Sequence, residues 1–565
     1  MKIKHMFILL AASVSTASCG FLDEYDPNST TVGNFYKSEA DIVTSLNGVY
    51  ASLTQSYYYT NNHYFTDVRS HDTAVTDSGA NSGIPYQFYN YTLTEENSYV
   101  YNRYTQLFKT ISRANTLLAH LDDVSYSNGD ARNTYEAEIR FLRALTYFHL
   151  VTEWGDVPLI LTELKTKDEV QANNYRRPKS EVYKAVFADL DFVLGSPLAD
   201  MQPASECGRA SKAAAWTLYG KAKLQYACDE DFASEKSAAL TSAIEKLTAA
   251  WNLRSFGELS DIPYNAIWDL STQKSCAENI FQINYIQNNA DLGSTWNYLF
   301  GPSKTGITSN KVGLMQNMTT KSVYDAFAKE DVRKNYLRET TVAGVTYYHT
   351  MKYADLECGA NGYGGNNWIV MRYADVALML AEAYYWQGTE PTAKSFLNMV
   401  RKRAGLGDWS GTDLRQGIYD ERRKVLDGED LQEHVQHMIR TVITGDIAAG
   451  MAEHHPENDK DLHEILAPLE KLFPCDLSYT AEELHKLTPD TLSDAVYDCA
   501  MKAYAAREEA FGLQPDGTPL MRELERVVML RVVDEYWMDH LEAMDDLRQG
   551  IGLRAYGTVK PVDEY

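Results

Sequence analysis

The chain contains little cysteine and lacks the common motifs for binding zinc or phosphate. Its 565 residues include seven cysteines, and no two of them form a Cys-x-x-Cys pair. A zinc knuckle and a thioredoxin-like redox motif are therefore excluded. The pattern Gly-x-x-x-x-Gly-Lys-Ser/Thr is also absent, so no P-loop can bind the phosphates of a nucleotide. No nucleophile elbow occurs either, and the sequence predicts no enzyme, no bound metal and no cofactor.

Basic residues are scarce relative to acidic ones. The 53 Lys and Arg residues against 78 Asp and Glu give a formal charge of −25. Nucleic-acid binding needs a clustered excess of Lys and Arg, so no nucleic acid is expected as a partner. Asparagine is unevenly distributed, with 28 in residues 1–418 and one, Asn458, in residues 419–565. The formal charge of the tail is −17, which leaves −8 for the first 418 residues. This break in composition predicts a boundary near residue 418.

No apolar run is long enough to cross a bilayer, but the chain begins with a segment typical of export. A short basic stretch precedes the apolar run Met6–Ala12, well below the ~20 residues that a spanning helix needs. The small residues of Ser15–Cys19 resemble the lipobox of bacterial lipoproteins, although Thr16 stands where that motif usually has Leu. The resemblance implies a signal peptide over residues 1–18 and acylation of Cys19, which would anchor the protein to a membrane. The alternative is ordinary cleavage nearby with an incidental cysteine.

Helical periodicity dominates residues 38–404. Ser38 is an expected N-cap, because Ser-Glu-Ala-Asp precedes an apolar stripe, and apolar residues recur at helical spacing in seven later segments. These helices are expected at 104–121, 135–153, 179–195, 208–228, 235–252, 371–388 and 390–404.

Two helical pairs are similar to tetratricopeptide hairpins. They cover residues 208–252 and 371–404, with Gly388 as the turn of the second pair. Such hairpins bury their apolar faces only by stacking on one another. The stretches 57–102 and 255–370 are rich in Asn, Gly and aromatic residues, which is typical of loops. The predicted fold class is all-α, a tetratricopeptide-like scaffold with long irregular insertions.

Several segments resemble the SusD/RagB family of nutrient-uptake lipoproteins, in family order within residues 1–424. The resemblance implies an outer-membrane, surface-exposed lipoprotein that captures oligosaccharide for a SusC-like TonB-dependent transporter and is not an enzyme. Residues 19–418 would then be a SusD-like glycan-binding domain without its C-terminal part. Arg140 and Arg143 are expected to bind carbonyls or carboxylates of the scaffold rather than ligand. The resemblance rests on the leader after Cys19 and on Arg140–Leu159, Gly208–Trp216, Arg372–Ala383 and Val400–Leu406.

Sugar binding needs flat aromatic faces for the pyranose rings and planar polar side chains for the hydroxyl groups. Both kinds of residue occur in the irregular stretches. The alternative for each aromatic residue is that it packs a loop onto the scaffold, and Tyr57–Tyr59 could equally contact the transporter. The candidate ligand-binding residues are Asp67, Arg69, Tyr86, Tyr89, Trp296 and Tyr298.

Residues 418–565 resemble a different family. Met521–Asp534 and Trp537–Gly557 are similar to the helical scaffold and two-helix finger of the SecA translocase ATPase, and 473–511 resemble its helical wing. The resemblance implies a helical bundle over residues 419–565, with preprotein and the SecYEG translocon as partners at the cytoplasmic side of the inner membrane. Tyr556 would lie at the finger tip. No P-loop is present to form the ATPase motor. His434, His437, His454 and His455 are interpreted as helix-surface residues rather than metal ligands.

Three accounts of the whole chain remain open. It is a glycan-binding lipoprotein with a foreign tail from a mis-joined gene, or a protein-export component without its ATPase, or a natural fusion. The segment Ile418–Asp430 suits both families, because Ile-Tyr-x-Glu-Arg-Arg-Lys fits a late SusD helix and the continuation Val-Leu-Asp-Gly-Glu-Asp fits SecA. The join is therefore predicted inside Ile418–Lys424.

Overall fold

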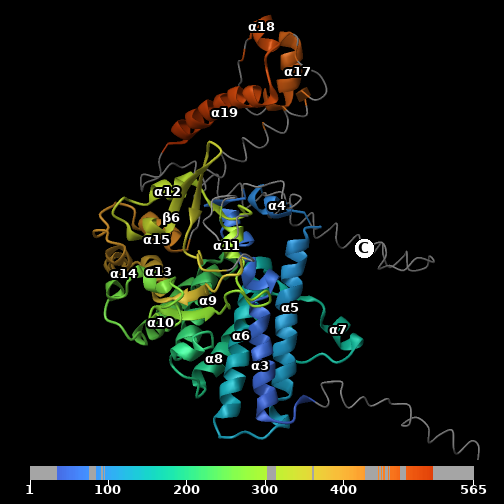
Figure 1. Ribbon diagram of the computed structural model, residues 1–565, viewed down its shortest axis with the longest axis vertical. Coiled ribbons are helices and arrows are strands. Elements are labelled where there is room, and N and C mark those ends of the chain that lie inside the picture. The colour runs from blue at the N-terminus through green and yellow to red at the C-terminus, as the bar shows by residue number, and fades with distance from the viewer. Residues whose placement is uncertain are drawn as a thin grey trace, which may run out of the picture.

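A computed structural model shows a mostly helical protein, as the sequence predicted (Figure 1). It describes residues 35–70, 72–75, 84–90, 93–94, 96–301, 313–358, 362–426, 458–470 and 479–512, together with Ile443, Ile447, Gly450, Met451, Pro456 and Leu477. The signal peptide and the finger segment therefore lie outside the described residues.

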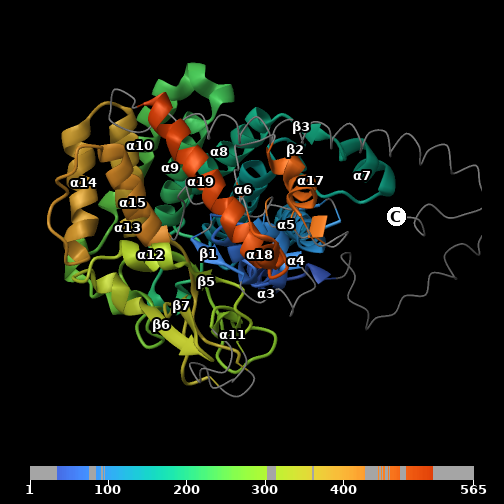
Figure 2. The ribbon, with the colours of Figure 1, turned by 90° about the horizontal axis from the view of Figure 1, so that it is seen from above.

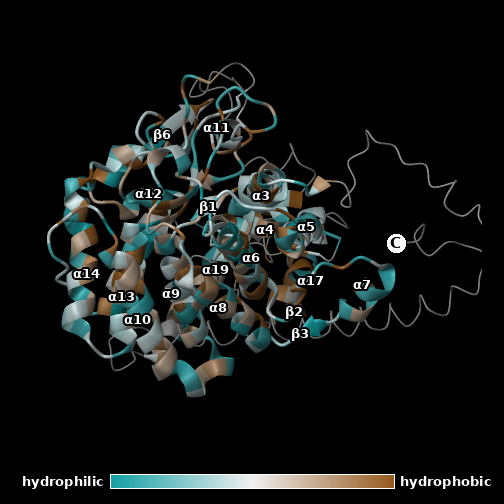
Figure 3. Ribbon diagram, turned by 90° about the horizontal axis from the view of Figure 1, so that it is seen from below, coloured by the Kyte–Doolittle hydropathy of each residue, from teal (hydrophilic) through white to brown (hydrophobic). Residues whose placement is uncertain are grey.

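The scaffold consists of long helices that pack on one another in chain order. Viewed from above, α14, α13, α10, α9, α8 and α6 succeed one another across the molecule (Figure 2). Figure 3 shows both apolar and polar segments along the scaffold helices. The helices are α3 (Glu39–Leu53), α5 (Ser98–Ala119), α6 (Ala131–Trp154), α8 (Lys179–Gly195), α9 (Lys212–Cys228), α10 (Lys236–Asn252), α13 (Tyr373–Trp386), α14 (Glu390–Arg403) and α15 (Leu414–Leu426).

The two predicted hairpins are α9–α10 and α13–α14, and α10 packs against α13 to stack them. Gly220 lets α9 and α10 approach closely, because a Cβ there would lie 2.4 Å from Cγ of Leu247. Gly388 has a φ of +82° in the turn between α13 and α14, a conformation that favours glycine. The tetratricopeptide-like scaffold is thus confirmed.

Local capping explains where the first helices begin. Ser38 forms a capping box with Asp41 at the start of α3, as its sequence predicted. α5 begins at Ser98 instead of 104, because the side chain of Asn97 accepts hydrogen bonds from the backbone N–H groups of Tyr99 and Val100. The aromatic residues of this first turn concealed the helix in the sequence.

The segments between the long helices contain short elements that the sequence did not predict. Four two-stranded antiparallel pairs occur in the described part of the chain: β1 (Thr73–Ala74) with β5 (Met318–Thr319), β2 (Val157–Pro158) with β3 (Arg176–Arg177), β4 (Asn279–Ile283) with β8 (Trp368–Arg372), and β6 (Leu337–Val342) with β7 (Val345–Thr350). The pairs β1–β5 and β4–β8 join segments that are distant in sequence. The strands β2 and β3 have two residues each, too few for a period-2 pattern to be visible. Short helices also occur, namely α4 (Ile84–Asn90), α7 (Lys167–Asn173), α11 (Trp296–Leu299) and α12 (Lys321–Ala326).

One hydrophobic core runs through the scaffold from Tyr36 to Ile418. The tail has a separate core, in which α17 (Asp459–Glu470), α18 (Ala481–Leu484) and α19 (Pro489–Phe511) bury residues such as Leu466 and Val496. All residues of this second core follow α15 in the sequence. Among the described residues, no helix is both long and apolar enough to cross a membrane.

Candidate functional site

The structure brings four of the six candidate ligand-binding residues together. α4 carries Tyr86 and Tyr89 and packs against the 3-10 turn η3 (Val68–Ser70), which carries Arg69 and directly follows Asp67. Val68 and Phe88 form the buried contact between these elements, and both tyrosines pack against that cluster. We call this surface the α4–η3 site.

Both tyrosines of the site keep part of their rings exposed. Tyr86 and Tyr89 are three residues apart on α4 and therefore share a face. Their ring centroids are 5.9 Å apart with the planes inclined by 45°. Each residue is half-buried, and Arg69 is exposed on the turn η3, which contacts α4. Two inclined, half-buried tyrosines and a guanidinium on the adjoining turn can contact the C–H face of a sugar and its hydroxyl groups.

Asp67 is held in a defined orientation by a residue from a distant segment. Asn317 Nδ2 donates to Asp67 Oδ2 at 3.2 Å, and the hydroxyl of Thr66 donates to Asp67 Oδ1 at 3.0 Å. Asn317 is 3% exposed and the Asp67 side chain is half-buried. A carboxylate oriented in this way is a suitable acceptor for sugar hydroxyl groups. Asn317 was missed in the sequence, where only its position in an Asn-rich stretch marked it.

The buried ion pair of Arg103 and Glu153 packs against the α4–η3 site through Phe65. Arg103 is fully buried, and its guanidinium donates to Glu153 Oε2 at 2.6 Å and to the carbonyl of Tyr58 at 2.7 Å. Its Cζ lies 4.6 Å from the ring centroid of Phe65, which packs edge-on against Phe88 of α4. A rigid base of this kind favours binding, because the site need not be ordered when a ligand arrives.

His63 lies fully buried near the site. Its ring centroid is 4.1 Å from that of Tyr64 and 4.9 Å from that of Phe300. Neither ring nitrogen has a hydrogen-bond partner, and burial lowers the pKa of His63 to about 3. The imidazole is therefore neutral at physiological pH and packs as an aromatic ring.

Trp296 is placed in the core, so it offers no ring face to a ligand in this conformation. The residue is 1% exposed, its indole N–H donates to the carbonyl of Thr60 at 3.2 Å, and its ring packs against Tyr285 and Trp368. It fits the alternative in which an aromatic residue packs a loop onto the scaffold. The side chain of Tyr298 lies outside the described residues.

Two of the three tyrosines at 57–59 have a structural role, while Tyr57 is half-buried. Tyr58 and Tyr59 are buried, and their hydroxyl groups bond Thr146 Oγ1 and His149 Nε2 of α6. They offer no surface to a transporter. The other two candidate positions, Cys19 and Tyr556, lie outside the described residues, as do the four tail histidines 434, 437, 454 and 455.

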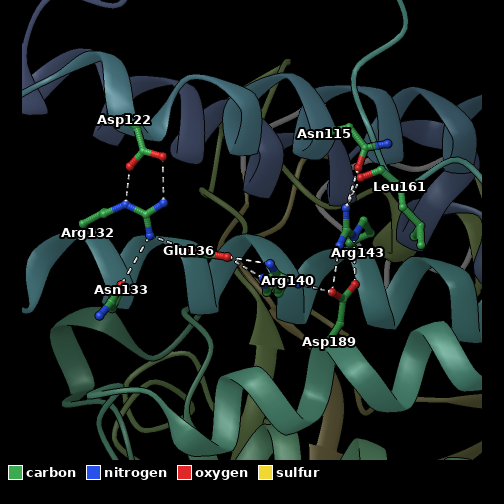
Figure 4. A network of polar contacts seen from close by, with 9 residues as sticks. All are labelled: Asn115, Asp122, Arg132, Asn133, Glu136, Arg140, Arg143, Leu161 and Asp189. Carbon is green, nitrogen blue, oxygen red and sulfur yellow. Dashed lines mark hydrogen bonds and ion pairs between the residues drawn. The ribbon is translucent and has the colours of Figure 1, made fainter.

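The specific segment Arg140–Leu159 has a structural role, as predicted. Arg143 binds both carboxylate oxygens of Asp189 on α8 and donates to the carbonyl of Leu161 at 2.9 Å, and Arg140 Nη1 reaches Asp189 at 3.0 Å (Figure 4). These bonds join α6, α8 and the loop after α6. Arg140 and Arg143 of this segment therefore hold the scaffold together.

The predicted join is part of the scaffold. On α15, Glu421 Oε1 accepts from Arg333 at 2.5 Å, Arg422 lies 3.3 Å from Glu382 of α13, and Arg423 lies 2.5 Å from Asp72. All three charged residues of the shared Glu-Arg-Arg motif thus bind the SusD-like body. The Glu-Arg-Arg motif is therefore bonded to the SusD-like scaffold, whatever the origin of the residues that follow it.

Comparisons with family models match both parts of the chain. The SusD family model matches residues 285–432, and a model described as starch-binding associating with outer membrane matches residues 20–224. The model of the SecA wing and scaffold domain matches residues 400–565. The two kinds of match overlap at 400–432, which contains α15.

Solved structures show the SusD-like fold for the first part. A laminarin-binding SusD-like protein superposes with a TM-score of 0.58 at 25% identity, covering 70% of this chain and 90% of that one. Surface glycan-binding protein A from Bacteroides thetaiotaomicron, in complex with laminarihexaose, gives 0.57 at 21% identity, with 69% and 88% covered. A SusD superfamily protein from Parabacteroides distasonis gives 0.57 at 22% identity, with 69% and 86% covered.

The tail is similar to SecA proteins. SecA of Heliobacterium modesticaldum is 42% identical over 166 residues, which are 29% of this chain and 19% of that protein. SecA of Pelotomaculum thermopropionicum is 45% identical over 167 residues, or 29% and 18% of the two chains. The chain thus spans about a fifth of the length of the curated SecA proteins it matches. The double resemblance predicted from the sequence, SusD-like and then SecA-like, is confirmed.

Proposed function

We propose that residues 19–418, which resemble the SusD family in sequence and fold, act as a cell-surface lipoprotein that captures oligosaccharide. The captured glycan would pass to a TonB-dependent transporter of the outer membrane. Acylated Cys19 would anchor the protein in that membrane, and residues 419–565 would be a foreign SecA-like tail. In this role the protein is not an enzyme.

The observation that carries the proposal is the α4–η3 site on a fold shared with proteins named for glycan binding. Tyr86 and Tyr89 supply two half-buried aromatic residues, and Asp67 and Arg69 supply polar groups of opposite charge on the adjoining turn. Sugars are bound by this combination, because apolar C–H faces stack on aromatic rings while hydroxyl groups need planar hydrogen-bonding partners. The identity of the glycan is open to experiment.

The experiment is a binding measurement with the full chain from residue 20, which leaves out the anchor. Affinity electrophoresis and calorimetry would use a panel that includes laminarihexaose and maltohexaose. The double variant Tyr86→Ala/Tyr89→Ala should weaken binding by about tenfold or more, since two stacked rings are lost. Tyr175→Ala is the control, because this exposed tyrosine comes two residues after the end of α7, a helix that lies apart from α4 in both Figure 1 and Figure 2. Binding of no glycan in the panel, or equal loss in the control, would contradict the proposal.

The tail supports a second candidate function. Its identity to SecA proteins favours a protein-translocation component that contacts preprotein and the SecYEG translocon without its own ATPase motor. Its separate hydrophobic core, including Leu466, Leu492 and Val496, is consistent with a unit that folds independently of the scaffold. Cross-linking of the chain to translocon-containing membranes tests this role, and absence of any cross-link from the tail argues against it.

The origin of the tail can be tested directly. If it comes from a mis-joined gene, a single long genomic read across codons 400–440 will not contain both sides of the join. A continuous read through this region would instead establish the fusion in the genome and remove the mis-joining account. Either result leaves the glycan-binding measurement unaffected.

A further inference from the structure

Arg423 of α15 binds a buried carboxylate from the opposite end of the scaffold sequence. Its Nε donates to Asp72 Oδ1 at 2.7 Å, and its Nη2 lies 2.5 Å from the same oxygen. The Asp72 side chain is 0% exposed and that of Arg423 is 13% exposed. The two residues are 351 positions apart in the chain. A buried carboxylate without a cation is strongly disfavoured, so this pair fixes Asp72 relative to α15.

Asp72 lies where the α4–η3 site meets its supporting strands. Its backbone N–H donates to Ser70 Oγ at 3.3 Å, and that hydroxyl donates in turn to the carbonyl of Asp67 at 2.6 Å. Its carbonyl accepts from the N–H of Thr320 at 2.8 Å. A displacement of Asp72 would therefore be transmitted to the backbone of Asp67 within one turn.

Residues 316–319 are hydrogen-bonded to the segment that carries Asp67 and Asp72. Gln316 accepts from the hydroxyl of Tyr64, Asn317 donates to Asp67, and residues 318–319 pair with residues 73–74 as β5 and β1. The described residues 64–70 and 72–74, together with 316–320, thus form one hydrogen-bonded unit, which we call the η3–β5 unit. It carries Asp67 and Arg69 on one side and contacts α15 through Asp72.

The neighbouring charged residues of α15 have other partners. Arg422 lies 3.3 Å from Glu382 and 3.7 Å from Asp375, both on α13, and its side chain is 19% exposed. Glu421 binds Arg333 and Arg401. Arg423 and Arg422 are thus adjacent arginines of similar exposure, of which one binds Asp72 and the other binds α13.

We propose that Arg423 is a positioning residue for the α4–η3 site. Through Asp72 it holds the η3–β5 unit in the arrangement that presents Asp67 and Arg69 beside Tyr86 and Tyr89. The inference rests on the proposed function for its consequence in glycan binding. Its structural part, that α15 fixes the η3–β5 unit, concerns the fold alone.

The test compares Arg423→Gln with Arg422→Gln in the full chain from residue 20. Hydrogen exchange of peptides covering residues 68–76 and 316–323 reports on the η3–β5 unit, including the Thr320 amide that bonds Asp72. In Arg423→Gln these amides should exchange about tenfold faster than in the parent chain, since loss of a buried partner lowers local stability. Arg422→Gln should leave them unchanged. Arg423→Lys should restore part of the protection, because it keeps the charge but not the planar donor group.

Affinity for laminarihexaose is measured on the same proteins. The dissociation constant should rise about tenfold in Arg423→Gln and stay within about twofold of the parent value in Arg422→Gln. If the parent chain binds no laminarihexaose, the proposed function loses support for this glycan, while exchange still decides the structural part. Equal exchange in the two variants would overturn the inference.

Hydrogen exchange in α9 and α10 distinguishes a general loss of stability from a local effect on the η3–β5 unit. If Arg423→Gln also accelerates exchange in those helices, the variant Asp72→Asn replaces it, because the amide keeps the shape of the carboxylate and removes its charge. Faster exchange confined to the η3–β5 unit in Asp72→Asn supports the inference. Unchanged exchange there overturns it.

Discussion

Arg143 and Asp189 form a two-bond ion pair between α6 and α8, with Nε to Oδ2 and Nη2 to Oδ1 both at 2.8 Å. The side chains are 5% and 4% exposed, so both charges are shielded from water. The same helix carries a contrasting pair at its N-terminal end, Arg132 with Asp122, whose carboxylate is 79% exposed (Figure 4). α6 thus takes part in one buried ion pair and one exposed ion pair, which can be compared directly.

Asp189→Asn should lower the free energy of unfolding by about 3–5 kcal/mol, because it leaves Arg143 buried without its anion. Asp122→Asn, the control, should have little effect, because exposed ion pairs contribute little. Chemical denaturation of the two variants measures both. Equal effects would show that the buried pair does not stabilise the contact between α6 and α8.

Trp296→Ala should destabilise the chain without acting on the glycan site directly. Removal of a fully buried indole leaves a cavity and costs about 3–5 kcal/mol. Thermal unfolding should therefore show a clear decrease in Tm, and glycan affinity measured below that transition should be unchanged. Unaltered stability with lost affinity would return Trp296 to the set of ligand-binding residues.

The stability of the chain should fall as the pH drops from about 6.5 towards about 3. His63 has an ordinary pKa of 6.5 when unfolded and about 3 when folded, because burial disfavours the imidazolium. Between these values the unfolded chain binds the proton and the folded chain does not, so acid favours unfolding. His63→Phe should reduce the slope of the free energy of unfolding against pH by up to about 1.4 kcal/mol per pH unit.

Burial also lowers the pKa of His149, so part of the acid sensitivity should persist in His63→Phe. Denaturation series at several pH values measure the slope. His485→Gln, at an exposed histidine of the tail, is the control variant. An identical slope in the parent chain and in His63→Phe would show that His63 is not the titrating group.

Cys19→Ser should release the protein from the membrane. The lipobox-like segment predicts that the parent chain carries acyl chains on Cys19 and fractionates with membranes. Metabolic labelling with a fatty acid and fractionation of an expressing bacterium check both properties. A parent chain that is unlabelled and cleaved near Ala17 would favour the ordinary signal peptide.

Much of the scaffold could be predicted because its signals are local. Ser38 and Asp41 are three residues apart, Gly388 marks its own turn, and the stripe of α6 repeats within one helix. The family-like segment from Arg140 also identified a structural motif correctly. Such features depend on residues within a few turns of one another, so periodicity and capping patterns are sufficient to find them.

The site was only partly predictable because its geometry depends on distant contacts. Tyr86 and Trp296 are both aromatic residues of irregular stretches, so the sequence gives them equal weight as ligand-binding candidates. Tyr86 is half-buried whereas Trp296 is fully buried, because tertiary packing decides exposure. The pair Asn317–Asp67 spans 250 positions and Arg423–Asp72 spans 351. No local pattern encodes pairings of that separation. α4 was also missed, because Pro85 and the tyrosines suggested a loop, although proline is tolerated in the first turn of a helix.

The most direct test of the central claim is a map of where a bound glycan protects the chain. Hydrogen exchange of the full chain from residue 20 would be compared with and without a saturating oligosaccharide found in the binding panel. The account predicts slower exchange in peptides covering residues 64–70 and 84–90, with the tail after residue 458 unchanged. Protection confined to other parts of the scaffold, or to the tail, would contradict the assignment of the α4–η3 site.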